Sequence, residues 1–152
     1  MFNHTDDLKT FKYGNHRKLE STKPKDILRV VQSFLDWVEA LGGSPPQAFS
    51  APAKSREVNF KSLYKSVRNL RQFGWTGTFD LLCSLGDLGI LNVRPDSCYL
   101  SGATGPLKGA RRLWGKTLPN ELTRLADEAA RTLGVPIAMI EDALCSYGKV
   151  IP

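Results

Sequence analysis

The sequence predicts an all-α fold, on three observations. Apolar residues recur at three- and four-residue spacing in several stretches, as they do on the buried face of a helix. Glycine or proline stands at the boundaries of most of these stretches, where helices begin and end. No run of five or more residues alternates between apolar and polar side chains, which is the pattern of a half-buried strand. With 152 residues, 41% of them hydrophobic, the chain is long enough for one domain with its own core.

The N-terminal third of the chain is predicted to hold an arm, a helix and a loop. Residues 1–22 are polar with weak periodicity, and we expect an arm that precedes a single helical domain over 23–152. A helix is predicted over about 25–41, because apolar residues recur at helical spacing between a proline and a pair of glycines. We expect its apolar face to be buried. Residues 43–57 are rich in proline and serine and predict a loop.

The rest of the chain predicts further helices separated by glycine- or proline-containing turns. A turn that contains Gly74 and Gly77 precedes one of them, and Asp80 is expected in its first turn, where a carboxylate favours the helix dipole. The helices are predicted at about 59–72, 79–89, 119–133 and 136–147, with a glycine hairpin and a basic helix at 102–115.

The net charge of +6 is concentrated in the middle of the chain. Residues 54–116 hold 11 basic and 4 acidic residues, a net charge of +7, whereas the segments before and after them carry +1 and −2. A concentrated positive field favours a polyanionic partner, most often nucleic acid. Lys61, Lys65 and Arg68 recur at four- and three-residue steps and are expected to share a helix face. That face suits an anionic partner, and a solvated helix surface explains it equally well.

The glycine hairpin and basic helix at 102–115 are the most informative motif. Glycine permits a tight turn and a close approach of the backbone to a ligand, and the free N–H groups at a helix start attract anions. The motif therefore predicts a corner that binds phosphate, from a DNA backbone or a pyrophosphate. The alternative is a structural turn followed by a solvated basic helix. The residues predicted to bind phosphate here are Gly102, Thr104, Gly105, Lys108, Arg111 and Arg112.

The sequence indicates no metal site, no cofactor and no membrane span. Three cysteines without CxxC spacing, and two histidines near the N-terminus, argue against a disulfide framework, a zinc site or a histidine triad. We therefore expect reduced thiols in an intracellular protein, in the cytoplasm or nucleus of a host. No stretch of about 18 apolar residues predicts a transmembrane helix.

Candidate groups for chemistry are few, and each has a structural alternative. Asp80 suits stabilisation of a helix start. Glu141 and Asp142 stand among apolar residues, so at least one is expected near the apolar side of its helix, where a base in a cleft is one option. Trp75 lies in a glycine-flanked turn, where an exposed indole would suit stacking of a displaced base, and core packing is the alternative.

Three runs of residues resemble one known family. The runs are Phe73-Gly74 with Thr76, Phe79-Asp80 and Leu82; Gly102 to Pro106 with Lys108 to Arg111 and Leu113; and Glu141 to Cys145 with Lys149. Over roughly residues 25–150 the sequence resembles the alpha-glutamyl/putrescinyl thymine pyrophosphorylases, most closely the group called clade 3. It departs from the family pattern at Trp75, where we expect an arginine, and at Ser146 and Gly148.

The resemblance implies a helix-hairpin-helix DNA glycosylase-like fold and an enzyme that modifies a base already in DNA. In the implied reaction, putrescine or an amino acid attacks a hydroxymethyluracil whose hydroxyl carries pyrophosphate. Pyrophosphate leaves and a hypermodified thymine remains, so the enzyme is a transferase or pyrophosphorylase whose partners are DNA and a small amine. The target base would have to leave the DNA stack. The family is linked to phage and mobile-element DNA modification.

The resemblance also implies roles for residues in the matching runs. Lys108, Arg111 and nearby N–H groups would hold the leaving pyrophosphate. A protonated amine needs a carboxylate base, for which Asp80 and Asp142 are the candidates, and Lys149 would contact phosphate or pair with an acid. Two alternatives remain open: a DNA glycosylase that excises a modified base, and a non-catalytic helix-hairpin-helix module that binds only DNA phosphates. The enzyme hypotheses expect a carboxylate in the same pocket as the basic residues.

Overall fold

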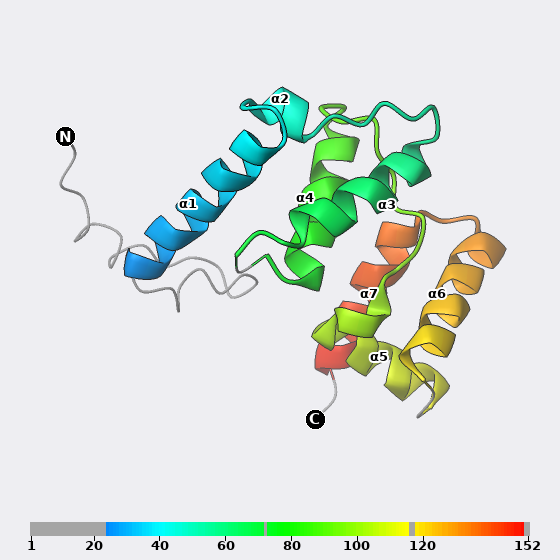
Figure 1. Ribbon diagram of the computed structural model, residues 1–152. Coiled ribbons are helices and arrows are strands. Elements are labelled where there is room, and N and C mark those ends of the chain that lie inside the picture. Colours follow the sequence, from blue (N-terminus) through cyan, green and yellow to red (C-terminus); the bar gives the residue numbers. More distant parts are fainter. Residues whose placement is uncertain (1–23, 72, 116–117, 151–152) are drawn as a thin grey trace. The chain divides into compact units, whose positions relative to one another are not determined.

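The computed structural model describes residues 24–71, 73–115 and 118–150, and every regular element in these ranges is a helix (Figure 1). The predicted all-α class is confirmed for this part of the chain, and the predicted arm over 1–22 lies outside it. No helix in the described ranges combines the length and the apolar character that a membrane crossing requires. The helices are α1 (Pro24–Ala40), α2 (Pro45–Ala48), α3 (Arg56–Val67), α4 (Trp75–Asp87), α5 (Thr104–Trp114), α6 (Pro119–Leu133) and α7 (Ile137–Val150), with a 3-10 helix η2 at Leu100–Gly102.

The described residues form two compact units. The first contains α1, α2 and the short stretch Leu70–Arg71, and the second contains α3 to α7 with their connections. In the first unit the N–H of Arg71 donates a hydrogen bond of 2.9 Å to the hydroxyl of Ser33, which ties the short stretch to α1. That residues 23–152 act as a single domain stays a prediction.

The apolar face of α1 is only partly buried, contrary to the expectation from its periodicity. Val38 is buried, but Leu28, Val31 and Leu35 are 69%, 49% and 52% exposed. Among the described residues of the first unit, α1 has the short helix α2, the turn before it and the stretch Leu70–Arg71 as packing partners. That surface is too small to cover a stripe that runs the length of a 17-residue helix.

Two helix starts differ from the predicted ones. Pro45 and Pro46 open α2 inside the predicted loop, because the first turn of a helix does not use the N–H groups that proline lacks. Helix α4 begins at Trp75 and continues through Gly77 without interruption, so Asp80 lies beyond its first turn and not in it. The expectation that Asp80 serves the helix dipole there is therefore wrong.

Helix α3 also lies earlier in the chain than predicted, over Arg56–Val67 instead of 59–72. The hydroxyl of Ser55 accepts a hydrogen bond of 3.3 Å from the N–H of Val58, which caps the helix start. Arg68, which we expected inside the helix, is its C-terminal cap. By contrast α6 has the predicted bounds, and Gly134 ends it with a left-handed φ of 64°.

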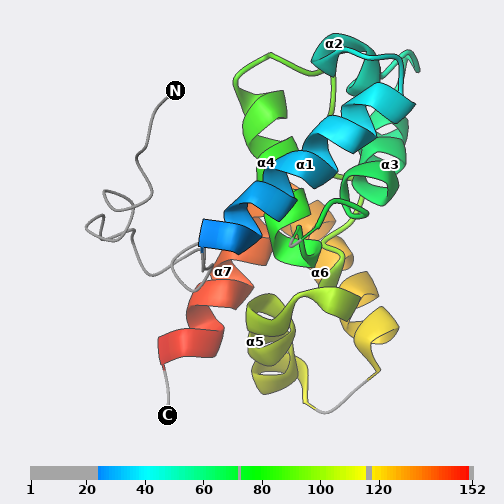
Figure 2. The same ribbon diagram turned by 60° about the vertical axis from the view of Figure 1, so that its left-hand side comes forward.

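The core of the second unit forms where α3 and α4 meet the C-terminal helices. Phe60 and Tyr64 of α3 are buried: Phe60 packs edge-on against Phe79 of α4, and Tyr64 stacks on Tyr99 with ring centroids 4.1 Å apart. Helices α5, α6 and α7 pack together beside them (Figure 2). Buried side chains of this size supply most of the hydrophobic stabilisation. A second cluster in this core consists of Cys98, Leu100, Ala110, Leu122, Ala126 and Leu144.

Candidate functional site

A pocket of about 570 Å³ lies at the start of α5. Thr104, Lys108 and Arg111 recur at four- and three-residue steps on this helix, so they project from one face. The preceding η2 adds Ser101 and Gly102. We call this the basic pocket, and its lining residues are Ser101, Gly102, Thr104, Leu107, Lys108, Arg111 and Arg112. Every residue predicted for the phosphate-binding corner lines it except Gly105.

The chemistry of the basic pocket suits an anion. Three of its lining residues are cationic and none is a carboxylate. The first N–H groups of a helix have no acceptor within the helix, and Pro106 has no N–H, so Thr104 and Gly105 carry the donors at this end of α5. The positive end of the helix dipole adds to the attraction of an anion. Cationic side chains and N–H groups bind phosphate through strong charge-assisted hydrogen bonds, so phosphate is an anion that suits this set of donors.

Gly105 and Gly109 serve the packing of α5 against α7, and neither has the positive φ of a turn glycine. A Cβ added at Gly109 would lie 1.9 Å from the carbonyl oxygen of Leu144, and one at Gly105 would lie 2.9 Å from the sulfur of Cys145. Gly148 of α7 completes the contact, since a Cβ there would lie 2.8 Å from the carbonyl oxygen of Gly105. The predicted glycine hairpin is thus a helix whose glycines permit close approach of another helix instead of a ligand.

Trp75, predicted to stack on a base, packs within the second unit. A Cβ added at Gly102 would lie 2.0 Å from its indole ring, so this glycine makes room for the tryptophan. The guanidinium carbon of Arg68 lies 3.7 Å from the centroid of the ring, a cation–π contact. The hydroxyl of Tyr64 donates a hydrogen bond of 3.2 Å to the carbonyl oxygen of Trp75. A base that stacked on Trp75 would therefore compete with Arg68 for the ring.

The remaining basic residues predicted for DNA binding come from α3 and its C-terminal end. Lys61 and Lys65 are exposed on α3, and Arg68 follows them at its end. None of the three lines the basic pocket.

Arg112 lines the basic pocket and also donates a hydrogen bond of 3.2 Å to the carbonyl oxygen of Gly148, which fixes its guanidinium beside the last turn of α7.

The residues predicted to be catalytic do not line the basic pocket either. Asp80 is half-buried on α4, while Asp142 and Lys149 are exposed on α7. The carboxylate that enters the core is Glu141, which is 2% exposed. This confirms the expectation that one of the two adjacent acids lies on the apolar side of its helix.

Glu141 influences titratable groups around it. Burial raises the pKa of Tyr64 above its ordinary value, with Arg68 opposing the shift and Glu141 adding to it. Burial, followed by Asp127 and then Glu141, raises the pKa of Cys98. Both groups are therefore neutral at physiological pH. Within the described ranges, no group of three or more histidine, cysteine or acidic residues is arranged to hold a metal ion.

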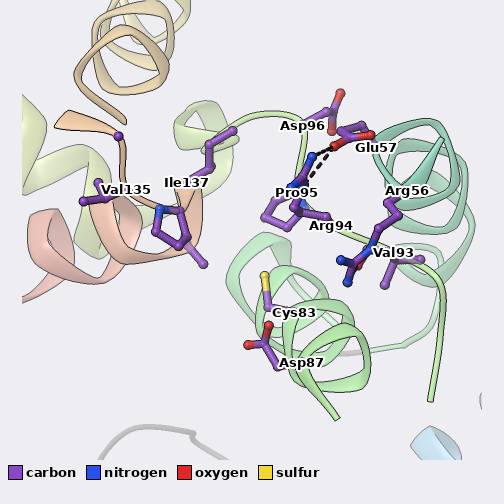
Figure 3. Close-up of a pocket in the computed structure, with 13 residues that line it drawn as sticks. Arg56, Glu57, Cys83, Asp87, Val93, Arg94, Pro95, Asp96, Val135 and Ile137 are labelled. Atoms are coloured by element: carbon purple, nitrogen blue, oxygen red, sulfur yellow. Dashed lines mark hydrogen bonds and ion pairs between the residues drawn. The ribbon is translucent and has the colours of Figure 1, made fainter. Parts of the chain in front are cut away.

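A second pocket of about 570 Å³ is formed by segments that are far apart in the sequence (Figure 3). We call it the mixed-charge pocket, because both arginines and carboxylates line it. Its wall comes from the start of α3, the end of α4, the connection at 93–96 and the turn between α6 and α7. None of these residues was predicted as a site residue. The lining residues are Arg56, Glu57, Cys83, Asp87, Val93, Arg94, Pro95, Asp96, Gly134, Val135, Pro136, Ile137 and Ala138.

Glu57 is held ionised at one edge of the mixed-charge pocket. The hydroxyl of Ser55 donates a hydrogen bond of 2.7 Å to it, and Nε of Arg94 donates another of 2.8 Å. The Ser55 hydrogen bond, followed by that of Arg94, lowers the pKa of Glu57 to about 2. Because the pKa of Glu57 in the folded chain lies below its ordinary value of 4.5, ionised Glu57 stabilises the fold above pH 4.5, and this contribution is lost as the pH falls toward 2.

We expect Glu57→Gln to remove this part of the pH dependence of stability. Thermal unfolding followed by circular dichroism at pH 6 and pH 3 should show a smaller fall in Tm for the variant than for the wild type. The difference should be small, since both partners of the Glu57–Arg94 ion pair are well exposed to solvent. Arg94→Gln should remove part of the same dependence. Identical pH profiles for wild type and Glu57→Gln would contradict the assignment.

The full chain matches a known protein family. The family model described as ADDT, amino acid:DNA transferase, covers residues 1–152. No curated protein and no solved structure matches the chain. The family name describes transfer between an amino acid and DNA, which agrees with the predicted modification of DNA by a transferase and with the predicted partners. The clade, the helix-hairpin-helix fold and the thymine chemistry stay predictions.

Proposed function

The chain belongs to the amino acid:DNA transferase family, and on that premise we propose that it joins an amino acid to a modified thymine in DNA. The acceptor in this proposal is hydroxymethyluracil whose hydroxyl carries pyrophosphate. The amino nitrogen attacks the methylene carbon, and the bond from that carbon to the pyrophosphate oxygen breaks. Pyrophosphate leaves with the bonding electron pair, and the amine gives its proton to a carboxylate. The product is a thymine that carries the amino acid on its methyl carbon.

The observation that carries the proposal is the basic pocket. Lys108, Arg111 and Arg112 converge there with the N-terminal end of α5, and no carboxylate among the lining residues opposes an anion. Fixed positive groups placed where negative charge develops lower the energy of a transition state in which pyrophosphate departs. The same groups suit the phosphates of the DNA backbone.

Asp80 and Asp142 are the proposed bases, with Lys149 as a proposed phosphate contact. A displacement at carbon places the nucleophile and the leaving group on opposite sides of the reacting atom. A base that serves the amine therefore belongs outside the pocket that takes the pyrophosphate. Neither aspartate lines the basic pocket, so the expectation of a carboxylate in the same pocket as the basic residues is not met, and this proposal requires the base to act from outside it.

A second candidate is a chain that binds DNA without catalysis. The lack of any carboxylate among the residues of the basic pocket favours it, because binding of phosphates needs only positive charge and N–H donors. In that case Asp80 and Asp142 would only stabilise the fold or keep the protein in solution.

Mass spectrometry of nucleosides separates the candidates. We expect DNA that contains pyrophosphorylated hydroxymethyluracil, incubated with the chain and an amino acid, to yield a heavier nucleoside and free pyrophosphate. Asp80→Asn or Asp142→Asn, whichever removes the base, should lower kcat by roughly 100-fold or more, whereas Arg124→Gln on α6 should not. A released free base would identify a glycosylase. Unchanged nucleosides from DNA that is bound would identify the non-catalytic module.

A further inference from the structure

We infer that the mixed-charge pocket binds a free α-amino acid as a zwitterion, with its carboxylate on Arg56 and its ammonium group on Asp87. That this amino acid is the donor of the transfer rests on the proposed function. That the pocket holds a zwitterion rests on the charges and contacts of the pocket itself.

Three of the five charged residues that line the mixed-charge pocket have a hydrogen bond or ion pair with another side chain. Arg94 is paired with Glu57, and Asp96 accepts a hydrogen bond of 2.5 Å from the hydroxyl of Tyr99. The other two charged lining residues are one cation, Arg56, and one anion, Asp87. A ligand that complements both must carry a negative and a positive charge.

Arg56 is positioned to receive a carboxylate. One of its terminal N–H groups donates a hydrogen bond of 3.0 Å to the carbonyl oxygen of Val93, which fixes the guanidinium. An arginine presents five N–H donors, so several remain for a ligand. Figure 3 shows this side chain extending from α3 toward α4, the helix that carries Cys83 and Asp87.

The other side of the pocket is apolar and suits the side chain of an amino acid. Figure 3 shows Val135 and Ile137 on the side away from Arg56. Burial, followed by the charge of Asp87, raises the pKa of Cys83 to about 12, so its thiol is neutral at physiological pH. A pocket of about 570 Å³ is of the size that holds small molecules.

The charge balance separates this pocket from the basic pocket. Two arginines and three carboxylates line it, so it lacks the excess of positive charge that a phosphate or pyrophosphate needs. A simple diamine would leave Arg56 without a partner and would place a cation beside it. An α-amino acid carries an ammonium group and a carboxylate on the same carbon, which are the two charges that complement Asp87 and Arg56.

The first test compares L-alanine with propionate and ethylamine, which lack its ammonium group and its carboxylate respectively. Binding to the full chain is measured by NMR titration, with and without DNA. We expect L-alanine to bind at least about tenfold more tightly than either analogue, because each charge-assisted hydrogen bond contributes about that factor. The inference would be overturned if propionate or ethylamine bound as tightly as L-alanine, or if L-alanine did not bind either with or without DNA.

The second test uses two variants and one matched control. Arg56→Gln and Asp87→Asn should each weaken L-alanine binding about tenfold or more. Arg56→Gln should also remove the preference for L-alanine over ethylamine, which lacks the carboxylate. Asp87→Asn should remove the preference for L-alanine over propionate, which lacks the ammonium group. Arg124→Gln removes an exposed charge from α6 outside both pockets and should leave binding unchanged. Asp87 is exposed at the end of α4, so its variant remains informative if Arg56→Gln does not fold.

The transfer assay distinguishes a failure of this inference from a failure of the proposed function. In that assay both variants should raise KM for the amino acid, and Arg56→Gln, which acts on the unreactive carboxylate, should leave kcat nearly unchanged, as expected for loss of uniform binding. Transfer to DNA that neither substitution affects would overturn the inference and support the proposed function. Zwitterion binding that both substitutions weaken, without any transfer to DNA, would support the pocket and overturn the proposed function.

Discussion

Replacing Gly109 by alanine should lower the free energy of unfolding of the second unit by about 3 kcal/mol or more, at the upper end of overpacking effects. The new Cβ would lie 1.9 Å from the carbonyl oxygen of Leu144 and 2.7 Å from its carbonyl carbon. Both are backbone atoms of α7, so relief requires α5 and α7 to move apart. The shift is measured by chemical denaturation, as a lower midpoint with an unchanged slope.

Gly77→Ala is the matched control for this substitution. Gly77 also lies inside a helix, but a Cβ added there would meet no atom within 4 Å. Alanine is the better helix former by roughly 0.5–1 kcal/mol, so this variant should be as stable as the wild type or slightly more stable. If both variants lost stability equally, the cost would come from glycine replacement in general and the helix contact would not explain it.

The two glycines of α5 show what a sequence pattern leaves open. Gly105 and Gly109 are four residues apart, which fits a hairpin with a following helix and equally a helix face that another backbone approaches. The distinction depends on Gly148, about 40 residues further along the chain. Because Gly148 has no side chain, the backbone of α7 can lie directly against the backbone of α5. No local pattern contains that information. By contrast, the ends of α6 depend on Pro119 and Gly134 beside it, and the sequence predicts them correctly.

The two pockets also differ in whether local sequence or contact between distant segments forms them. The basic pocket draws all its lining from residues 101–112, and helical spacing alone brings its cations to one face, so the sequence predicts it. The mixed-charge pocket joins Arg56, Asp87 and residues 134–138, which are far apart in the sequence and come together only in the folded chain. Periodicity likewise predicts that α1 is amphipathic, but it does not indicate whether the chain supplies enough apolar surface to cover that face.

Replacing Lys108 and Arg111 together by alanine should weaken binding of DNA and flatten its dependence on salt. Each phosphate contact in duplex DNA adds about 0.9 to the slope of log affinity against log salt concentration. If both residues contact phosphates, the slope should fall in magnitude by about 1.8 and the affinity by roughly tenfold or more. Fluorescence anisotropy at several salt concentrations measures both quantities.

A double variant with the same loss of charge controls for the general field of the protein. Arg124→Ala with Arg131→Ala removes two positive charges from α6, outside both pockets. Its slope should stay near that of the wild type, because distant exposed charges are screened over roughly 10 Å at 0.1 M salt. If the slope were unchanged in the Lys108 and Arg111 variant, DNA phosphates would not bind in the basic pocket. If that variant nevertheless released less pyrophosphate in the transfer assay, the pocket would serve the leaving group alone.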